Sequence, residues 1–346
     1  MAIMHSPPQR LVDAPVEGGK QLSLPAGSDR LVPISVRAFG AFLEYFPKRL
    51  RRAALRGLAL TLTDDYAAIQ ALGRCAAVSD ISIMGDLGLI QGSLDDTAVL
   101  ATYYRTKTWR PGFAKFFNDY FRHQGRGIFV DIGANIGLTI IPVAGNSGIS
   151  CFAIEPDPAN FRYLRNNVSV NCPHRNVPLL NLALFDSTGS LDFQLSVSNK
   201  GDHRLLSRSG NRGALGEQQW PVIRVPTARL DDVLPLHRSD DAGPLAAKIV
   251  AQGAEAQIVA GGHRVLSHAG AIVVEVYPYA IERLRGDFAA LLRFCTDHFA
   301  WGALTMGEHH SVLAWTPVQA VADKLRDQYQ RASGNAYEFF HLFLKK

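Results

Sequence analysis

Short apolar runs alternate with amphipathic stretches over most of the chain, a pattern typical of strands followed by helices. The apolar runs predict strands at residues 128–131, 150–155, 179–184, 191–195, 245–250 and 271–277. The stretches around them predict helices at residues 95–107, 113–124, 136–144, 159–167, 256–267 and 288–298. Residues 301–306 and 311–316 predict an antiparallel pair of strands. The alternation as a whole predicts an α/β fold with a mostly parallel sheet and helices on both of its faces.

The first 94 residues follow a different pattern. Residues 1–34 are rich in Pro, Gly and Ser and lack periodicity, which predicts a mobile leader. Residues 35–94 predict a helical extension that ends in a short hairpin around Gly85 and Asp86. The alternating pattern then defines the main domain, residues 95–346.

Basic side chains crowd the stretch between Lys48 and Arg56. The run favours a solvated helix face, and contact with a membrane surface or an anionic ligand is the alternative. The net charge of +5 and the pI near 9.0 permit an anionic partner without requiring one. No recognised nucleic-acid-binding signature accompanies the basic run, so we expect no nucleic-acid partner.

Composition narrows the class of protein. The 346 residues are 47% hydrophobic and 19% charged, which is enough apolar material for a sizeable core. The apolar runs fall short of the roughly 20 residues that cross a bilayer, and the first residues lack the pattern of a signal peptide. The four cysteines form no CxxC pair, which argues against a zinc module or a disulfide framework. We therefore expect a cytoplasmic protein.

The most informative segment is an apolar strand that runs directly into a Gly-x-x-x-Gly turn. Asp131 stands at the end of the strand, and Gly133 and Gly137 enclose Asn135 in the turn before the next helix. Glycines at such a turn allow positive φ angles and let a ligand approach the backbone. The spacing differs from Gly-x-Gly-x-x-Gly, which disfavours a nicotinamide dinucleotide. A fixed acid at this place suits a ligand with a positive centre.

A second acid, Glu155, ends the next predicted strand. A carboxylate at that place can accept hydrogen bonds from both hydroxyls of a ribose. A positively charged amino acid joined to an adenosine fits both acids. Asp131 and Glu155 together therefore predict S-adenosylmethionine as the cofactor.

Five blocks of the sequence, in this order, resemble one known family: VDIGANIG, AIEPDPANFRYLRNN, LNLALFDSTGSLDF, SNKGDHRL and KIVAQGAEAQIVAGG. Over about residues 95–316 they resemble the FkbM family of S-adenosylmethionine-dependent methyltransferases. The resemblance implies a Rossmann-like, class I methyltransferase fold, in which a seven-stranded, mostly parallel sheet has an antiparallel last strand. It also implies an O-methyltransferase that acts on a hydroxyl of a carbohydrate-containing or secondary-metabolite acceptor.

The resemblance also assigns roles to individual residues. The glycine turn described above matches the part that holds the methionine moiety of the cofactor, and Glu155 matches the ribose acid. Asn181 and Ala183 match the segment that flanks the adenine, although an ordinary strand end has the same pattern. Residues 198–205 match a loop near the substrate side.

The sequence departs from the family pattern at the end of the strand predicted at residues 245–250. The family typically has Lys-Ile-Asp there, whereas this chain has Lys248, Ile249 and Val250. Ligands of open α/β sheets bind at such strand ends, and a valine cannot accept a proton. Either the site uses another base, or the protein is a catalytically impaired scaffold that still binds the cofactor, or Val250 is an inactivating substitution.

Transfer of a methyl group to an alkyl hydroxyl benefits from a general base. The candidate catalytic residues are His203, Glu275 and Lys248. His203 lies in a polar loop, where a solvated histidine is the simpler interpretation. Glu275 and Lys248 each stand inside an apolar strand, and a charge there needs a partner or a polar cleft. Lys248 is a candidate partner of Glu275 and, alternatively, a candidate contact of the substrate.

Four further side chains are candidates for contact with the acceptor: Trp109, Asp202, Arg204 and Glu255. Glu255 also fits a structural role as a cap of the following helix, and Trp109 also fits an ordinary core position. The adjacent pair His309 and His310 has no third ligand at a suitable spacing, so no metal site is predicted.

Overall fold

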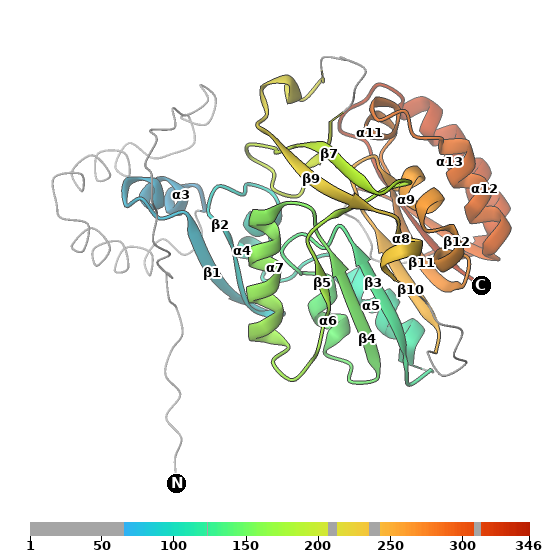
Figure 1. Ribbon diagram of the computed structural model, residues 1–346, viewed down its shortest axis with the longest axis horizontal. Helices are drawn as coiled ribbons and strands as arrows, with labels where there is room; N and C mark the ends of the chain where they lie inside the picture. Colours follow the sequence, from blue (N-terminus) through green and yellow to red (C-terminus); the bar gives the residue numbers. More distant parts are fainter. Residues whose placement is uncertain (1–65, 123, 207–212, 235–242, 308–312) are drawn as a thin grey trace, which may run out of the picture. The chain divides into compact units, whose positions relative to one another are not determined.

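The computed structural model describes residues 66–122, 124–206, 213–234, 243–307 and 313–346 (Figure 1). The chain divides into two compact units, Met1–Thr108 and Trp109–Lys346. The predicted leader, the basic run between Lys48 and Arg56 and the pair His309 and His310 lie outside the described residues.

The described part of the first unit consists of α3 (Tyr66–Cys75), β1 (Asp80–Gly85), β2 (Gly88–Ser93) and α4 (Val99–Thr106). The two strands pair antiparallel across a turn at Asp86 and Leu87, where the sequence predicts a hairpin. The side chains of Tyr66 and Gln70 both donate hydrogen bonds to the Leu94 carbonyl, which joins α3 to the end of the hairpin.

The second unit is built on one large sheet. Its strands are β3 (Gly127–Ile132), β4 (Ile149–Ile154), β5 (Leu179–Leu180), β10 (Leu245–Ile249), β11 (Ala269–Val276), β12 (Trp301–Met306), β13 (Thr316–Pro317) and β14 (Phe340–Lys345). Their order across the sheet is β13-β12-β14-β11-β10-β3-β4-β5. The strands from β11 to β5 pair in parallel, and β14 lies antiparallel between β11 and β12.

The two faces of the sheet are filled differently. Side chains alternate across a strand, so each register row belongs to one face. On one face, Phe129 and Phe343 contact the phenylalanines of α5 (Pro111–Arg122). On the opposite face, the aliphatic residues of β3, β10 and β11 pack in one core with residues of α9 (Glu255–Gly261), α12 (Phe288–His298) and α13 (Val318–Ala332).

The helices cover the same two faces of the main sheet. On the first face, α6 (Ile140–Ala144) contacts α5, β4 and α7 (Pro158–Asn171). Asp157 caps α7 by accepting a hydrogen bond from the Asn160 amide, and Pro158 occupies the first turn, where it costs no hydrogen bond. The predicted Rossmann-like sheet, mostly parallel with helices on both faces, is confirmed. The sheet has an eighth strand, the two-residue β13, beyond the seven that were expected.

A second, four-stranded sheet is inserted between β5 and β10. It has the order β6 (Ala183–Leu184), β9 (Val222–Ala228), β7 (Gly189–Gln194) and β8 (Arg204–Leu205). The strand predicted at residues 179–184 is therefore two strands in two different sheets, and the one predicted at 191–195 does not join the main sheet. Local hydrophobicity indicates a strand but does not say which partner it pairs with.

The end of the chain also differs from the expected pattern. β12 occupies residues 301–306 as predicted, but it pairs mainly with β14. Only β13, at residues 316–317, extends it on the other side. The helix α13 separates β13 from β14. β14 enters the sheet through a partner, β11, that lies about 70 residues earlier in the chain, and no local pattern encodes such a pairing.

We predict that Phe343→Ala lowers the free energy of unfolding by about 3–5 kcal/mol, because its buried ring packs edge-on against Phe113 and Phe116 on α5. The measurement is equilibrium unfolding in urea. Val222→Ala is the matched control: Val222 is 48% exposed on β9, so its loss is expected to stay within about 0.5 kcal/mol. Equal losses in the two variants would contradict the placement of β14 within the core.

Candidate active site

The carboxyl ends of the parallel strands lie along one edge of the sheet. The direction in which the chain adds strands reverses between β3 and β10, and we call this place the switch point. From β3 the chain proceeds to β4 and β5 on one side, and it later returns to β10 and β11 on the other. Open α/β sheets bind their ligands outside the strand ends at such a switch point. Most of the residues that the sequence singles out lie at or next to these strand ends.

Asp131 and Lys248 face one another across the switch point. They are register partners on β3 and β10, and Lys248 Nζ lies 2.9 Å from Asp131 Oδ1. The lysine also donates to the Gly133 carbonyl at 2.8 Å. Both side chains are buried. The second carboxylate oxygen, Asp131 Oδ2, is buried and has no hydrogen-bond partner among the described residues.

The glycine turn is shaped by close backbone contacts. Gly133 has φ +75°, and a Cβ there would overlap the Val250 carbonyl oxygen. Gly137 has φ +96°, and a Cβ there would lie 3.0 Å from Leu164 on α7. Asn135 also has a positive φ, +52°, a conformation that Asn tolerates better than most residues. Both glycines are therefore required by the geometry of the turn.

Glu155 lies directly after β4 and supports the glycine turn. One of its carboxylate oxygens accepts a hydrogen bond from the Asn135 amide at 2.8 Å, and the other accepts one from the Asp157 amide at 3.0 Å. Burial raises the pKa of Glu155 to about 8, although both amide groups favour its ionised form. The structure thus brings Asp131, the turn and Glu155 together.

Asn181 and Ala183 have different surroundings. The Asn181 amide donates to the carbonyls of Glu155 and Pro156, so it fixes the backbone around the acid. Ala183 is buried in β6, where it pairs with Thr227 of the second sheet. Their assignment to the adenine stays a prediction.

The loop before β8 lies against the glycine turn. The Lys200 carbonyl accepts hydrogen bonds from the side-chain amides of Asn135 and Asn160, each at 2.9 Å. His203 Nδ1 accepts from the Ser196 amide, and its Nε2 lies 3.6 Å from Asp157. Burial lowers the pKa of His203 to about 4, so the ring is neutral near pH 7. Its catalytic role stays a prediction.

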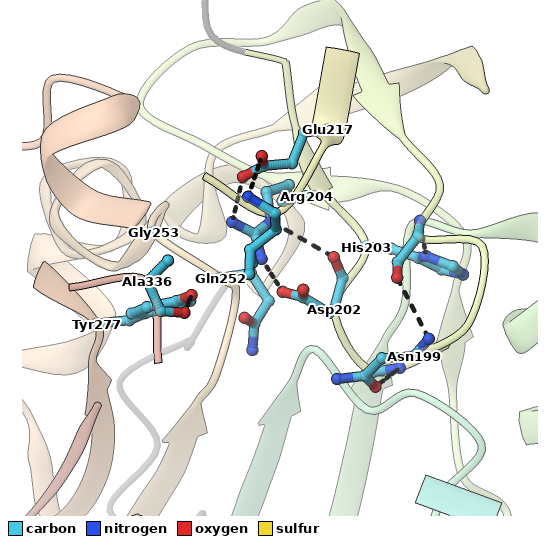
Figure 2. A network of polar contacts seen from close by, with 12 residues as sticks. Asn199, Asp202, His203, Arg204, Glu217, Gln252, Gly253, Tyr277 and Ala336 are labelled. Carbon is cyan, nitrogen blue, oxygen red and sulfur yellow. Dashed lines mark hydrogen bonds and ion pairs between the residues drawn. The ribbon is translucent and has the colours of Figure 1, made fainter. Parts of the chain in front are cut away.

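Asp202 and Arg204 belong to one network of buried charges (Figure 2). Arg204 donates to Asp202 on one side and lies 3.4 Å from Glu217 on the other. Glu217 in turn accepts a hydrogen bond from the Tyr279 hydroxyl at 2.8 Å. Burial raises the pKa of Asp202 despite the nearby guanidinium. Arg204 is thus already engaged by two carboxylates within the protein.

Glu275 lies in a second cluster, on the same sheet face as Asp131 and Lys248. It faces His341 of β14 in register, and His341 Nε2 lies 3.2 Å from Glu275 Oε2. Gln252 donates to the other oxygen at 2.7 Å, and Arg110 lies 4.0 Å away. Burial alone would raise the pKa of Glu275, but His341, Arg110 and Lys248 lower it below its ordinary value. Glu275 is therefore an ionised hydrogen-bond acceptor at neutral pH.

Three members of this cluster have no signal in the sequence. Arg110 and His341 are separated by 231 residues and meet only through the pairing of β14. Gln252 reaches Glu275 from a backbone with φ +52°, which a sequence does not reveal.

The remaining candidates have clear structural surroundings. Glu255 is the first residue of α9 and does not cap it: its two oxygens accept hydrogen bonds from the amides of Ala251 and Gly253, in the loop before the helix. Trp109 is half-buried, and the Arg110 guanidinium lies 5.0 Å from its ring centre. Their contacts with an acceptor stay predictions. Among the described residues no three or more His, Cys, Asp or Glu side chains gather as metal ligands.

Within the described part of the chain, no helix has the length and apolar character that a membrane crossing requires.

Comparisons with known proteins give weak matches. No family model matches the chain, and neither does any curated protein. Among solved structures, it is similar to the N-terminal domain of human METTL16 (12% identity, 81% of this chain and 82% of that one, TM-score 0.37). It is also similar to a putative transferase, PH0793, from Pyrococcus horikoshii (11% identity, 81% and 83%, TM-score 0.36). A third is a precorrin-6y C5,15-methyltransferase from Geobacter metallireducens (14% identity, 67% and 88%, TM-score 0.31).

These TM-scores are too low to carry an argument about function. The fold class rests on the strand order, in which β14 runs antiparallel between β11 and β12, and the two-residue β13 pairs antiparallel with the outer side of β12. Apart from β13, this is the topology that the sequence resemblance implies. Membership of the FkbM family and the absence of a nucleic-acid partner stay predictions.

We predict that the stability difference between wild type and Glu255→Gln shrinks as the pH rises from 5 to 8. Burial and the neighbouring Glu275 raise the pKa of Glu255 to about 8. The folded state then binds a proton that the unfolded state releases near pH 4.5, so the contribution of Glu255 falls over this range. Urea unfolding at several pH values measures the difference. A difference that grows with pH would contradict the raised pKa.

Proposed function

We propose that this protein is an S-adenosylmethionine-dependent methyltransferase. The observation that carries the proposal is the unpartnered oxygen Asp131 Oδ2, which is buried at the switch point beside the glycine turn. An unsatisfied buried carboxylate oxygen is costly, and a ligand that donates a charged hydrogen bond removes the cost. The ammonium group of the methionine moiety is such a donor.

The other residues at these strand ends fit the rest of the cofactor. Each carboxylate oxygen of Glu155 accepts one backbone hydrogen bond and keeps further lone pairs for the hydroxyls of a ribose. Asn181 would hold the backbone of Glu155 and Pro156 next to the adenine. Ala183 would belong to the segment that flanks the adenine. Lys248 would orient Asp131 through the 2.9 Å contact. The cofactor supplies the methyl group and a sulfonium leaving group, so the protein has to position the acceptor and exclude water.

The acceptor side of the proposed site lies at the ends of β10 and β11. Glu275 is an ionised carboxylate there, and Asp202 has a raised pKa, which suits a group that takes up a proton. Together with the sequence resemblance, these acids favour an O-methyltransferase that acts on a hydroxyl of a carbohydrate-containing or secondary-metabolite acceptor. Trp109 and Glu275 would orient that hydroxyl, and His203 is the alternative base.

We predict that wild type binds S-adenosylhomocysteine, which keeps the ammonium and the ribose, in a calorimetric titration. Asp131→Asn and Glu155→Gln should each weaken binding by about 1–3 kcal/mol, because each replaces a hydrogen-bond-accepting oxygen with an amide group that donates. Asp192→Asn is the control, since Asp192 lies on the second sheet with an exposed side chain. Absence of binding by wild type, or unchanged affinity in both site variants, would contradict the proposal.

A catalytically impaired, cofactor-binding scaffold is the second candidate, and Val250 is the observation that favours it. Val250 follows β10 directly, and its amide donates to the Ile132 carbonyl of β3, so its side chain lies at the switch point itself. The family pattern has a carboxylate at this position. Binding of cofactor without turnover would follow if that carboxylate were indispensable.

We predict that wild type and Val250→Asp both release S-adenosylhomocysteine from S-adenosylmethionine when incubated with a panel of hydroxylated acceptors, since Glu275 and Asp202 supply carboxylates without Val250. Val250→Asn is the matched control for size and polarity. Turnover by Val250→Asp alone would instead establish the impaired scaffold.

A further inference from the structure

Residues 196–205, which we call the strap, connect two places that are far apart in the sequence. The strap runs from the end of β7 to β8 in the second sheet. The middle of the strap contacts the glycine turn through Lys200, and its last part, at Arg204, contacts Tyr277, which lies between β11 and the helix α11 (Pro278–Arg283). Figure 2 shows Asn199, Asp202, His203 and Arg204 along this segment.

The first anchor of the strap lies on the glycine turn and on α7. The side-chain amides of Asn135 and Asn160 both donate to the Lys200 carbonyl, so one backbone oxygen carries two hydrogen bonds. Asn135 belongs to the turn itself, and its own amide donates to Glu155. Asn135 therefore links the strap directly to the turn, where the ligand is proposed to bind.

The second anchor is the buried guanidinium of Arg204. Its carbon lies 5.3 Å from the ring centre of Trp220 and 5.6 Å from that of Tyr277, so it is held between two aromatic rings. Its nitrogens contact Asp202 within the strap and Glu217 beyond it. The residue is 1% exposed.

Glu217 extends this anchor to α11. Besides Arg204, it accepts hydrogen bonds from the Tyr279 hydroxyl and the Leu215 amide, and Arg283 lies 3.8 Å away. Two arginines and two acids are therefore balanced in one buried network. Such a network costs desolvation energy and adds little net stability, but it specifies one arrangement of the segments that it joins.

We propose that Arg204 is a positioning residue for cofactor binding: from the far end of the strap, it holds the Lys200 carbonyl against Asn135 of the glycine turn. Arg204 touches no part of the turn and acts through the strap alone. The inference rests on the proposed function, because it takes the glycine turn as the cofactor site. It also gives Arg204 a role different from direct contact with the acceptor.

A purely structural role and a positioning role have different consequences. A structural arginine changes the stability of the protein but leaves the affinity of the folded molecules unchanged. A positioning arginine changes the affinity for a ligand on the turn, even in variants that remain folded. Amide hydrogen exchange of residues 196–205 reports the state of the strap directly.

The test measures the affinity for S-adenosylhomocysteine by calorimetry and the exchange of the strap with and without this ligand, in the full chain. Arg204→Lys keeps the buried charge, but one ammonium cannot reach both acids and stack between two rings. Arg204→Met removes the charge altogether. Arg224→Met is the matched control, because Arg224 is an ion-paired arginine of the second sheet with an exposed side chain.

In wild type and Arg224→Met we expect the ligand to slow exchange throughout the strap. In Arg204→Lys we expect the affinity to fall about tenfold and this slowing to be reduced, and in folded Arg204→Met we expect both effects to be larger. Arg204→Lys with the affinity and the exchange pattern of wild type would overturn the inference while leaving the proposed function intact. No binding by wild type would overturn the proposed function and, with it, the inference.

Discussion

The buried ion pair between Lys248 and Asp131 is the interaction on which the rest of the site depends. A charge inside a parallel sheet is tolerated only with a partner, and the register of β3 and β10 brings these two side chains to the same row. The lysine occupies one oxygen of the carboxylate and also donates to the backbone of the glycine turn. The second oxygen is buried and has no hydrogen-bond partner among the described residues. One contact thus fixes the turn and orients the acid.

The charges around this pair follow one rule: each buried cation is matched with an acid. Lys248 has Asp131, Arg204 has Asp202 and Glu217, and Arg283 has Glu217. The half-buried Arg110 lies near Glu275 in the same way. The pairing differs in its effect on the acids. It lowers the pKa of Glu275, whereas burial still raises that of Asp202. These two carboxylates therefore differ in basicity.

The sequence was sufficient for features encoded over short distances. The strand, the turn and Asp131 lie within ten residues of one another, and positive φ angles at Gly133 and Gly137 follow from the residue type. The sequence was not sufficient to predict contacts that depend on the pairing of strands far apart in the chain. The second sheet takes β7 away from the main sheet, and β14 brings His341 to Glu275 across 66 residues. The partner of Lys248 was not predicted: the sequence offered Glu275 or the substrate, whereas the register of β3 and β10 pairs Lys248 with Asp131.

The same register gives a physical meaning to Val250. Ile249 pairs with Val274, so the next residues along these two parallel strands are Val250 and Glu275. A carboxylate at position 250 would stand near Glu275 as well as Asp131, and mutual repulsion would raise the pKa of at least one of the acids. With valine in that place, His341, Arg110 and Lys248 are sufficient to keep Glu275 ionised. A valine at position 250 is therefore compatible with an ionised carboxylate, Glu275, at the end of the neighbouring strand β11.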